Sequence, residues 1–376
     1  MEKNILVVDD SALMRRVISD IISSDSRFKV MDIAVNGLEA FDLVTRKAHF
    51  YDAVLLDINM PKMNGIEFLE QVAKLKIRLK VIVVSTVAKE GADETIKCLE
   101  LGAFDFVTKP DRFSDARSDS FSRRIIEVLS AATGQEQSVH SKTYSENTGI
   151  QSHEGIAQND SHIQELYDLN AKVLRKPHRP VMKTARKLVA LACSTGGPKA
   201  LQCVIPMLPE NLDAPVIIVQ HMPMGFTKSL ADRLNELSKV HVKEAEDGDV
   251  IKKGWVYIAQ GGKQMRLVKK VGNYVLTETA EQARNGLKPC ADIMYESLQG
   301  MDIDEITCVV LTGMGADGTL GIKGLNEKNN IYVISQDEKT STVYGMPRMV
   351  HEVGLSDEVV SLESVADAIA KNVGLS

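Results

Sequence analysis

Three acidic side chains stand directly after short apolar runs in the first part of the chain. Asp9 and Asp10 follow the run Ile5–Val8. Asp57 follows the run Ala53–Leu56. The carboxyl ends of parallel strands share one edge of a sheet, so we expect these three carboxylates to lie close together. Their mutual repulsion favours a divalent cation, and Mg²⁺ is typical of sites built from a few carboxylates and water.

Two further polar groups follow the next apolar runs. Thr86 comes after Val81–Val84 and Lys109 comes after Phe104–Val107, so a hydroxyl and an ammonium group join the same edge. Pro110 follows Lys109, and we expect the peptide bond between them to be cis.

A second constellation lies in the last 190 residues and consists of a serine, a histidine and an aspartate. Ser194 follows the apolar run Leu188–Ala192 closely, and His221 follows Val216–Gln220. Asp317 lies in a glycine-rich turn after a third apolar run. A carboxylate that orients an imidazole, which in turn takes the proton of a hydroxyl, is typical of nucleophilic acyl transfer.

The neighbours of Ser194 offer both a rival nucleophile and a way to stabilise charge. Cys193 precedes the serine, and a thiol is intrinsically the better nucleophile. Side chains alternate along an extended segment, so only one of the two can face His221, and Cys193 continues the apolar strand. We therefore favour Ser194. The main-chain N–H groups of the turn Gly313–Gly315 are candidates for an oxyanion hole.

The elements that must position these residues are two series of β-branched apolar runs separated by amphipathic stretches. Continuous apolar strands alternating with helices predict parallel sheets covered on both faces. The fold class is therefore α/β: an N-terminal (βα)5 domain and a C-terminal doubly wound parallel-sheet domain. The glycines and short alternating runs from Trp255 to Leu276 predict a β-hairpin insertion in the second domain.

Composition divides the chain into three parts. We predict a first domain over residues 1–130, a linker over 131–186 and a second domain over 187–376. The stretch Gly134–Ser161 is rich in polar residues and poor in large apolar ones, so it cannot bury enough surface to fold alone. Residues 162–174 could form one amphipathic helix, and a basic stretch follows it.

Charge and cysteine content exclude several functions. The formal net charge of -6 and the 5% aromatic content argue against nucleic acid as a partner, which needs basic and stacking surfaces. The five cysteines form no CxxC pair, which disfavours a disulfide framework or zinc site and favours a reducing compartment. The first apolar run is too short for a signal peptide, and no run approaches the roughly 20 residues of a membrane span. We expect a soluble cytoplasmic protein with no direct membrane insertion.

The motifs of the first domain resemble those of response-regulator receiver domains over about residues 3–130. The matching stretches are Val7–Ser11, Leu55–Pro61, Val84–Thr86 and Phe106–Pro110. The resemblance implies that Asp57 is the phosphoacceptor and that Asp9, Asp10 and Asp57 hold Mg²⁺. It also implies that Thr86 and Lys109 read the phosphoryl group.

The second domain resembles the chemotaxis protein-glutamate methylesterases over about residues 187–374. The stretches that carry the resemblance are Ser194–Pro198, Gln220–Phe226, Glu244–Gly248, Leu311–Gly318 and Tyr344–Arg348. It implies that Ser194, His221 and Asp317 are catalytic and that Thr195 and Met314 support the site or the oxyanion. Lys288 and Cys290 stand in a stretch, Gly286–Asp292, that departs from the family's pattern.

Together the two resemblances imply a phosphorylation-activated hydrolase of chemotaxis adaptation, with Mg²⁺ in the receiver domain and no cofactor in the catalytic domain. It would demethylate glutamate methyl esters on the cytoplasmic helices of chemoreceptors, releasing methanol, and would also deamidate receptor glutamines. A chemotaxis histidine kinase would be the phosphodonor. The alternative is a response regulator whose output domain binds a protein partner without catalysis.

Overall fold

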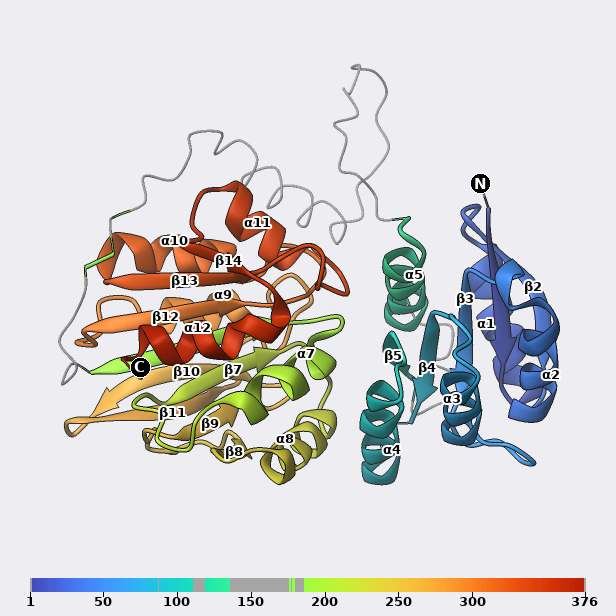
Figure 1. Cartoon of the computed structure of the whole chain (residues 1–376), viewed down its shortest axis with the longest axis horizontal. Helices are drawn as coiled ribbons and strands as arrows, with labels where there is room; N and C mark the ends of the chain where they lie inside the picture. The colour runs from blue at the N-terminus through green and yellow to red at the C-terminus, as the bar shows by residue number, and fades with distance from the viewer. Residues whose placement is uncertain are drawn as a thin grey trace, which may run out of the picture. The chain divides into compact units, whose positions relative to one another are not determined.

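The computed structural model describes residues 2–86, 88–110, 119–135, 176, 178–179 and 186–374 (Figure 1). The chain forms two compact units, the first containing Met1–Glu136 and the second most of the rest. Most of the predicted linker, including the predicted helix at 162–174, lies outside the described residues.

The first unit is a five-stranded parallel sheet in the order β2-β1-β3-β4-β5. Asp9 directly follows β1, and Asp57 is the last residue of β3. These two strands are neighbours at the point where the strand order reverses. Ligands of open α/β sheets bind at such a point. The strands are β1 (Lys3–Val8), β2 (Phe28–Ala34), β3 (Ala53–Asp57), β4 (Val81–Ser85) and β5 (Asp105–Thr108). The helices are α1 (Ala12–Ser23), α2 (Gly37–Lys47), α3 (Gly65–Lys74), α4 (Lys89–Glu100) and α5 (Asp119–Thr133), with a 3-10 turn at Ala48–Phe50.

Side-chain caps begin three of these helices. Ser11, Asn36 and Asn64 each accept a hydrogen bond from a main-chain N–H of the first turn of α1, α2 and α3. Such caps satisfy donors that have no partner inside the helix. The βα turns at the carboxyl edge are therefore fixed locally by the sequence.

The peptide bond between Lys109 and Pro110 was expected to be cis, and this expectation is wrong. The cis bond among the described residues is Lys288–Pro289, in the second unit. Trans is the lower-energy form of an X–Pro bond by about 0.5–1 kcal/mol, and a proline after a strand end does not by itself reverse that preference.

The second unit is built on a seven-stranded sheet in the order β14-β13-β12-β6-β7-β9-β8, in which all neighbouring pairs are parallel. Its strands are β6 (Lys187–Cys193), β7 (Val216–Gln220), β8 (His241–Glu244), β9 (Trp255–Ile258), β12 (Glu305–Val310), β13 (Ile331–Gln336) and β14 (Glu358–Val360). Its helices are α7 (Gly197–Val204), α8 (Phe226–Leu237), α9 (Ala291–Ser297), α10 (Thr319–Lys328), α11 (Met346–Glu352) and α12 (Val365–Asn372), with 3-10 turns at Ile205–Met207 and Leu362–Ser364. The chain leaves β6 toward β7 and later returns to β12 on its other side, so β6 is the reversal point.

The predicted hairpin insertion is present but begins later than expected. β10 (Gln264–Lys270) and β11 (Asn273–Thr279) form a separate antiparallel pair, whereas β9, at the start of the predicted hairpin, joins the main sheet between β7 and β8. β9 is only four residues long, and the glycines after it suggested a tight turn. It pairs in parallel with β8, the strand before it, and with β7 about 40 residues earlier, so the pattern of a hairpin did not reveal its place.

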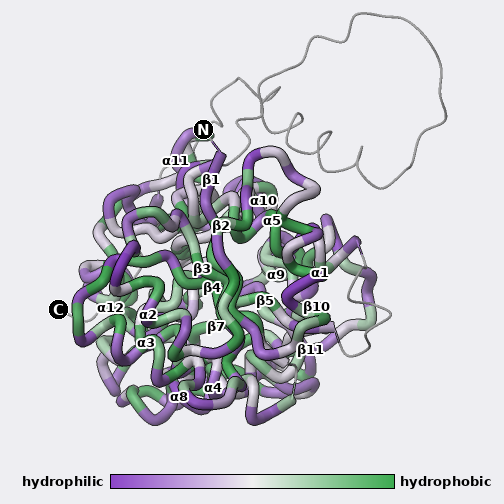
Figure 2. Tube along the Cα trace, turned by 90° about the vertical axis from the view of Figure 1, so that its right-hand side faces the viewer, coloured by the Kyte–Doolittle hydropathy of each residue, from purple (hydrophilic) through white to green (hydrophobic). Residues whose placement is uncertain are grey.

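The core of the second unit lies between the sheet, the hairpin and the helices α9, α10 and α11. Alternate residues of β6, Leu188, Ala190 and Ala192, face this core, and the residues between them face the other side. In the first unit, hydrophobic colour follows the strands β3 and β4 in Figure 2, while the helices carry both colours. Among the described residues, no helix is long and apolar enough to cross a lipid bilayer.

Candidate active site

Ser194 lies in the sharp turn that joins β6 to α7. Its main-chain N–H donates to the Thr312 carbonyl (3.0 Å), and its carbonyl accepts from Gly197 N–H (2.7 Å). Gly196 begins the helix at φ 79°, a left-handed conformation that glycine adopts without strain. The turn therefore sets Ser194 just before the N-terminus of α7, at the carboxyl edge of the central strand.

The side chain of Gln220, the last residue of β7, holds this turn in place. Its Nε2 donates to the Ser194 carbonyl (3.0 Å) and to the His221 carbonyl (3.2 Å). Its Oε1 accepts from the Cys193 thiol (3.0 Å). Gln220 is almost fully buried, so these bonds are shielded from water. One side chain thus connects the serine turn to the histidine turn.

Cys193, the rival nucleophile, faces away from solvent. Its side chain is buried, and burial raises the pKa of the thiol well above its usual value. The thiolate is the reactive form, so a thiol held protonated and bound to Gln220 is inert. The structure therefore favours Ser194 over Cys193.

His221 and Asp317 are brought together as the sequence predicted. His221 Nε2 lies 2.7 Å from Asp317 Oδ2, and both side chains are at most 10% exposed. Burial alone would raise the pKa of Asp317, but the hydrogen bond and charge of His221 outweigh it, together with N–H bonds from Asp292 and Ala291, and the pKa falls below its usual range. Asp317 is thus an ionised carboxylate that fixes the His221 ring, whose other nitrogen, Nδ1, is left for a proton transfer.

The three side chains follow three adjacent strands, β12, β6 and β7. Backbone bonds also join the turns, since His221 N–H donates to the Cys193 carbonyl (3.2 Å). Among the described residues Ser194 Oγ makes no hydrogen bond to His221, which differs from the predicted arrangement. Hydrogen bonds between nucleophile and base are often loose without substrate and tighten on binding.

The glycine-rich turn after β12 supplies fewer oxyanion donors than the sequence suggested. Gly313 N–H already donates to the Val343 carbonyl (3.0 Å), so it is not free. Met314 N–H and Gly315 N–H make no hydrogen bond within the described part of the chain. A Cβ at Gly313 would lie 2.9 Å from Ser194 Cβ, so the turn approaches the serine closely. The donors of this turn that remain available are therefore Met314 N–H and Gly315 N–H rather than Gly313 N–H.

Thr195 is buried in the same network. Its carbonyl accepts from Thr312 Oγ1 (2.9 Å), and Thr312 Oγ1 also accepts from Val343 N–H (2.9 Å). The main chain at Thr195 is thus tied to the turns after β12 and β13.

The carboxylates of the first unit converge at the predicted edge. Oxygens of Asp9, Asp10 and Asp57 lie within 4.8 Å of one another. Lys109 Nζ lies 2.9 Å from Asp9 Oδ2 and 2.8 Å from Asp57 Oδ1. Burial raises the pKa of Asp57 to about 6, with Asp9 adding to the rise and Lys109 opposing it. Burial lowers the pKa of Lys109, but Asp57 and Asp9 raise it more.

This donor set fits a hard divalent cation, because it consists of carboxylate oxygens with one exposed member, Asp10. Thr86 is exposed just beyond β4, and Lys109 N–H donates to the Ser85 carbonyl (2.6 Å), which ties the two strand ends together. The structure therefore gathers Asp9, Asp10, Asp57 and Lys109, and it leaves Thr86 at the rim of the same edge.

Sequence reasoning missed two kinds of site residue. Gln220 was quoted only as part of a motif, although a polar residue that ends an apolar strand is a usable signal. From the sequence, Cys290 is only part of a stretch that departs from the family's pattern and Asp292 has no role, whereas the structure sets both against Asp317.

Comparison with known families and proteins gives matches along nearly the whole chain. Residues 189–369 match the family model described as CheB methylesterase, and residues 5–118 match the response regulator receiver domain. A "Protein-glutamate methylesterase/protein-glutamine glutaminase" of Bacillus subtilis is 37% identical over 371 residues, covering 98% of this chain and 98% of that protein. A protein of the same name from Pyrococcus horikoshii is 39% identical and covers 98% of this chain and 93% of its own. The solved CheB methylesterase catalytic domain of Thermotoga maritima is 38% identical over 50% of this chain and 99% of that one, with a TM-score of 0.48.

Proposed function

The chain belongs to the CheB methylesterase family with a response regulator receiver domain, and we propose that Ser194, His221 and Asp317 are its catalytic residues. Its function is that of a phosphorylation-regulated chemotaxis methylesterase, and the same site serves glutamine deamidation. The observation that carries the residue assignment is the 2.7 Å contact between His221 Nε2 and Asp317 Oδ2 beside the Ser194 turn.

The reaction follows from these positions. Ser194 Oγ attacks the carbonyl carbon of a glutamate methyl ester, and its proton passes to the free nitrogen of His221. Collapse of the tetrahedral adduct breaks the bond to the methoxy oxygen, which takes the proton from His221 and leaves as methanol. Water then attacks the glutamyl ester of Ser194 by the same route and releases the free carboxylate. A glutamine side chain reacts identically and releases ammonia.

Asp317 stabilises the imidazolium that forms in both steps, because its pKa is low and its carboxylate touches the ring. We assign the oxyanion contact to Met314 N–H, with Thr195 holding the serine turn to its neighbours. A main-chain donor that is fixed before the reaction stabilises the oxyanion without reorganisation.

In the receiver domain, Asp57 is the proposed phosphoacceptor, with Asp9, Asp10 and Asp57 as the residues that would hold Mg²⁺. When bound, the ion would offset negative charge on the phosphoryl group. Lys109 contacts Asp57 directly, which supports a role for it in binding the phosphoryl oxygens, and Thr86 at the rim is the proposed second residue that responds to them. A receiver domain implies a kinase phosphodonor, here a histidine kinase of chemotaxis, and we propose methylated helices of chemoreceptors as the substrate. All five cysteines are free, which supports a cytoplasmic location.

Replacing the nucleophile tests the assignment. Ser194→Ala should lower methanol release from methylated receptor by at least about 10³-fold, because the acyl intermediate cannot form. Phosphorylation of Asp57 by acetyl phosphate should be unchanged in this variant. Cys193→Ala is the matched comparison and should cost far less. Near-normal activity of Ser194→Ala, with loss of activity in Cys193→Ala, would transfer the role to the thiol.

A further inference from the structure

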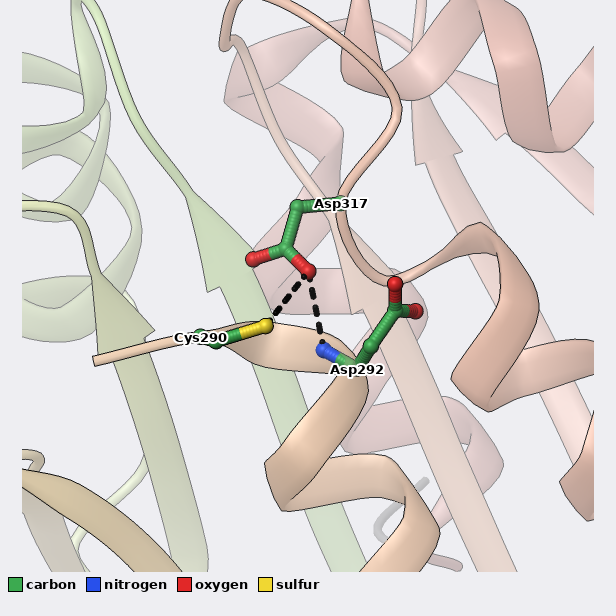
Figure 3. A group of neighbouring side chains, drawn as sticks. All are labelled: Cys290, Asp292 and Asp317. Atoms are coloured by element: carbon green, nitrogen blue, oxygen red, sulfur yellow. Dashed lines mark hydrogen bonds between the residues drawn. The ribbon is translucent and has the colours of Figure 1, made fainter. Parts of the chain in front are cut away.

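Every hydrogen-bonding position around the Asp317 carboxylate is filled from one short segment and one histidine. Oδ2 accepts from His221 and from Ala291 N–H (2.6 Å). Oδ1 accepts from the Cys290 thiol (3.1 Å) and from Asp292 N–H (3.0 Å), as Figure 3 shows. Three of the four donors therefore come from residues 290–292, where α9 begins.

The side chain of Asp292 in turn accepts hydrogen bonds from the segment that carries Asp317. Its Oδ1 accepts from the N–H of Gly318, the residue after Asp317 (3.0 Å), and from the N–H of Gly321 in the first turn of α10 (2.7 Å). Each aspartate thus bonds the main chain next to the other. Such a reciprocal pair fixes the position of both segments, because neither can turn without breaking bonds on both sides.

The two carboxyls differ in charge despite their proximity. Burial raises the pKa of Asp292 to about 8, and the charge of Asp317 adds to the rise. The pKa of Asp317 moves the other way, because His221 and main-chain N–H groups stabilise its ionised form. Two buried carboxyls with separated pKa values can lie together without both carrying charge.

The hairpin insertion holds Cys290 in its position beside Asp317. Gln264, the first residue of β10, is fully buried, and its Oε1 accepts from Cys290 N–H (2.8 Å). Its Nε2 donates to the Leu287 carbonyl (3.0 Å), so both ends of the segment before α9 are held. The thiol itself is buried, and burial raises its pKa, so it is a hydrogen-bond donor rather than a thiolate.

The cluster of Cys290, Asp292 and Asp317 also has the spacing of metal ligands, with its ligand atoms within 4.8 Å of one another. The carboxylate oxygens that a cation would need already accept N–H and S–H hydrogen bonds. A cation would have to displace those donors, and the thiol would have to lose its proton. The contacts therefore describe an anion held by donors.

We propose that Cys290 and Asp292 are positioning residues of this active site, holding the Asp317 carboxylate in the orientation that faces His221 Nε2. The inference rests on the proposed role of Asp317. The Cys290 thiol supplies one side-chain hydrogen bond to Asp317, and the Asp292 carboxyl anchors the turn that carries it. The hairpin β10–β11, through Gln264, is part of the same support.

The test measures kcat and KM for methanol release from methylated receptor by full-length variants. Cys290→Ala should lower kcat about tenfold with KM unchanged, since one hydrogen bond to a charged group is lost. Cys290→Ser keeps a donor and should restore kcat to within about threefold of the wild type. Asp292→Ala should lower kcat about 100-fold, whereas Asp292→Asn keeps the oxygen acceptor and should recover most of that loss. Cys308→Ala deletes another buried thiol of the same unit, in β12, and is the matched control, expected to leave kcat within about twofold.

A double-mutant cycle separates positioning from general damage. If Cys290 acts through Asp317, Cys290→Ala should have no further effect on kcat in an Asp317→Asn background. Equal impairment of Cys290→Ala and Cys290→Ser, an equal loss in Cys308→Ala, or an undiminished effect in the Asp317→Asn background would each overturn the inference. Wild-type activity of Asp317→Asn alone would overturn the proposed triad and the inference together, whereas wild-type kcat of Cys290→Ala and Asp292→Ala beside an inactive Asp317→Asn would overturn the inference alone.

Discussion

Three aspartates that solvent scarcely reaches dominate the chemistry of this chain, and their surroundings shift their pKa values in different directions. Burial raises the pKa of Asp57 to about 6 and that of Asp292 to about 8. The pKa of Asp317 is instead lowered, because His221 and two main-chain N–H groups donate hydrogen bonds directly to its oxygens. Residues of one type thus differ through their neighbours alone: Asp57 is the proposed phosphoacceptor, Asp292 a structural carboxyl and Asp317 an imidazole partner.

The raised pKa of Asp292 predicts a pH-dependent cost in stability. Between pH 4 and pH 8 the unfolded chain has Asp292 ionised while the folded chain keeps its proton, so the folded state binds more protons. The free energy of unfolding therefore falls as pH rises through this window, and the cost is absent below about pH 4. Asp292→Asn cannot ionise, so its melting temperature relative to the wild type should increase from pH 5 to pH 8. Calorimetry of both full-length proteins checks this, and parallel pH profiles would contradict a raised pKa.

At the scale of elements, a polar residue at the end of one strand holds the turn that follows its neighbour. Gln220 on β7 holds the Ser194 turn, and Thr312 after β12 holds Thr195. Gln336 at the end of β13 accepts from Thr312 N–H (2.8 Å). The carboxyl edge of the sheet is thus fixed from strand to strand, which keeps catalytic turns of different chain segments in register.

Gly197 shows how little room this arrangement leaves. A Cβ at this residue would overlap Gln220 Oε1, so Gly197→Ala must displace Gln220 and break its bonds to Cys193 and Ser194. We expect a loss of about 1–3 kcal/mol in unfolding free energy, from the overpacking. We also expect kcat to fall at least about tenfold, because the nucleophile is displaced.

The control for that variant is Gly324→Ala in α10. There the new Cβ would meet the amide end of Gln299, a flexible side chain outside the active site. Alanine also favours helix, so stability should be unchanged or slightly improved and kcat should stay at the wild-type level. Urea unfolding and methanol release measure both effects. Equal behaviour of the two variants would show that Gln220 does not constrain the serine turn.

At the scale of the whole molecule, two units with separate chemistry share one chain. The carboxylates of the first unit are the proposed site of phosphorylation, and the sheet edge of the second unit is the proposed esterase site. The chain ahead of β6 also contacts the second unit. His178 bonds the buried Glu305 at the start of β12, and Arg179 N–H donates to Asn330 Oδ1 (2.9 Å). A fragment of the catalytic domain should therefore begin at residue 176, so that these contacts are kept.

Phosphorylation should raise the esterase activity of the intact chain. With acetyl phosphate and Mg²⁺ we expect methanol release to increase about 5- to 150-fold, the usual range for coupling between two sites. Removing Mg²⁺ with EDTA, or Asp57→Asn, should abolish the increase and leave basal activity unchanged. The esterase activity of the fragment 176–376 should be unchanged by the phosphodonor and by EDTA. Loss of fragment activity on chelation would instead place a metal in the hydrolase site.

The motifs at the strand ends identified the family, the α/β fold and the enzyme class, and the comparisons confirm all three. This was possible because buried parallel strands are continuous apolar runs whose ends are visible in the sequence. β2 could not be predicted from such a run, because it is an edge strand whose exposed positions interrupt the apolar residues.

By itself the sequence determined which residues stand at the carboxyl edges: Asp9, Asp57 and Lys109 in one unit, and Ser194, His221 and Asp317 in the other. Strand ends are local properties that show as the ends of continuous apolar runs, so a single chain displays them. Only the tertiary structure decided that Cys290 and Asp292 meet Asp317, that Gln220 holds the serine turn, and that β9 belongs to the main sheet. Those contacts join segments about 25 residues or more apart, and their geometry depends on how helices and hairpin pack on the sheet, which no local pattern encodes.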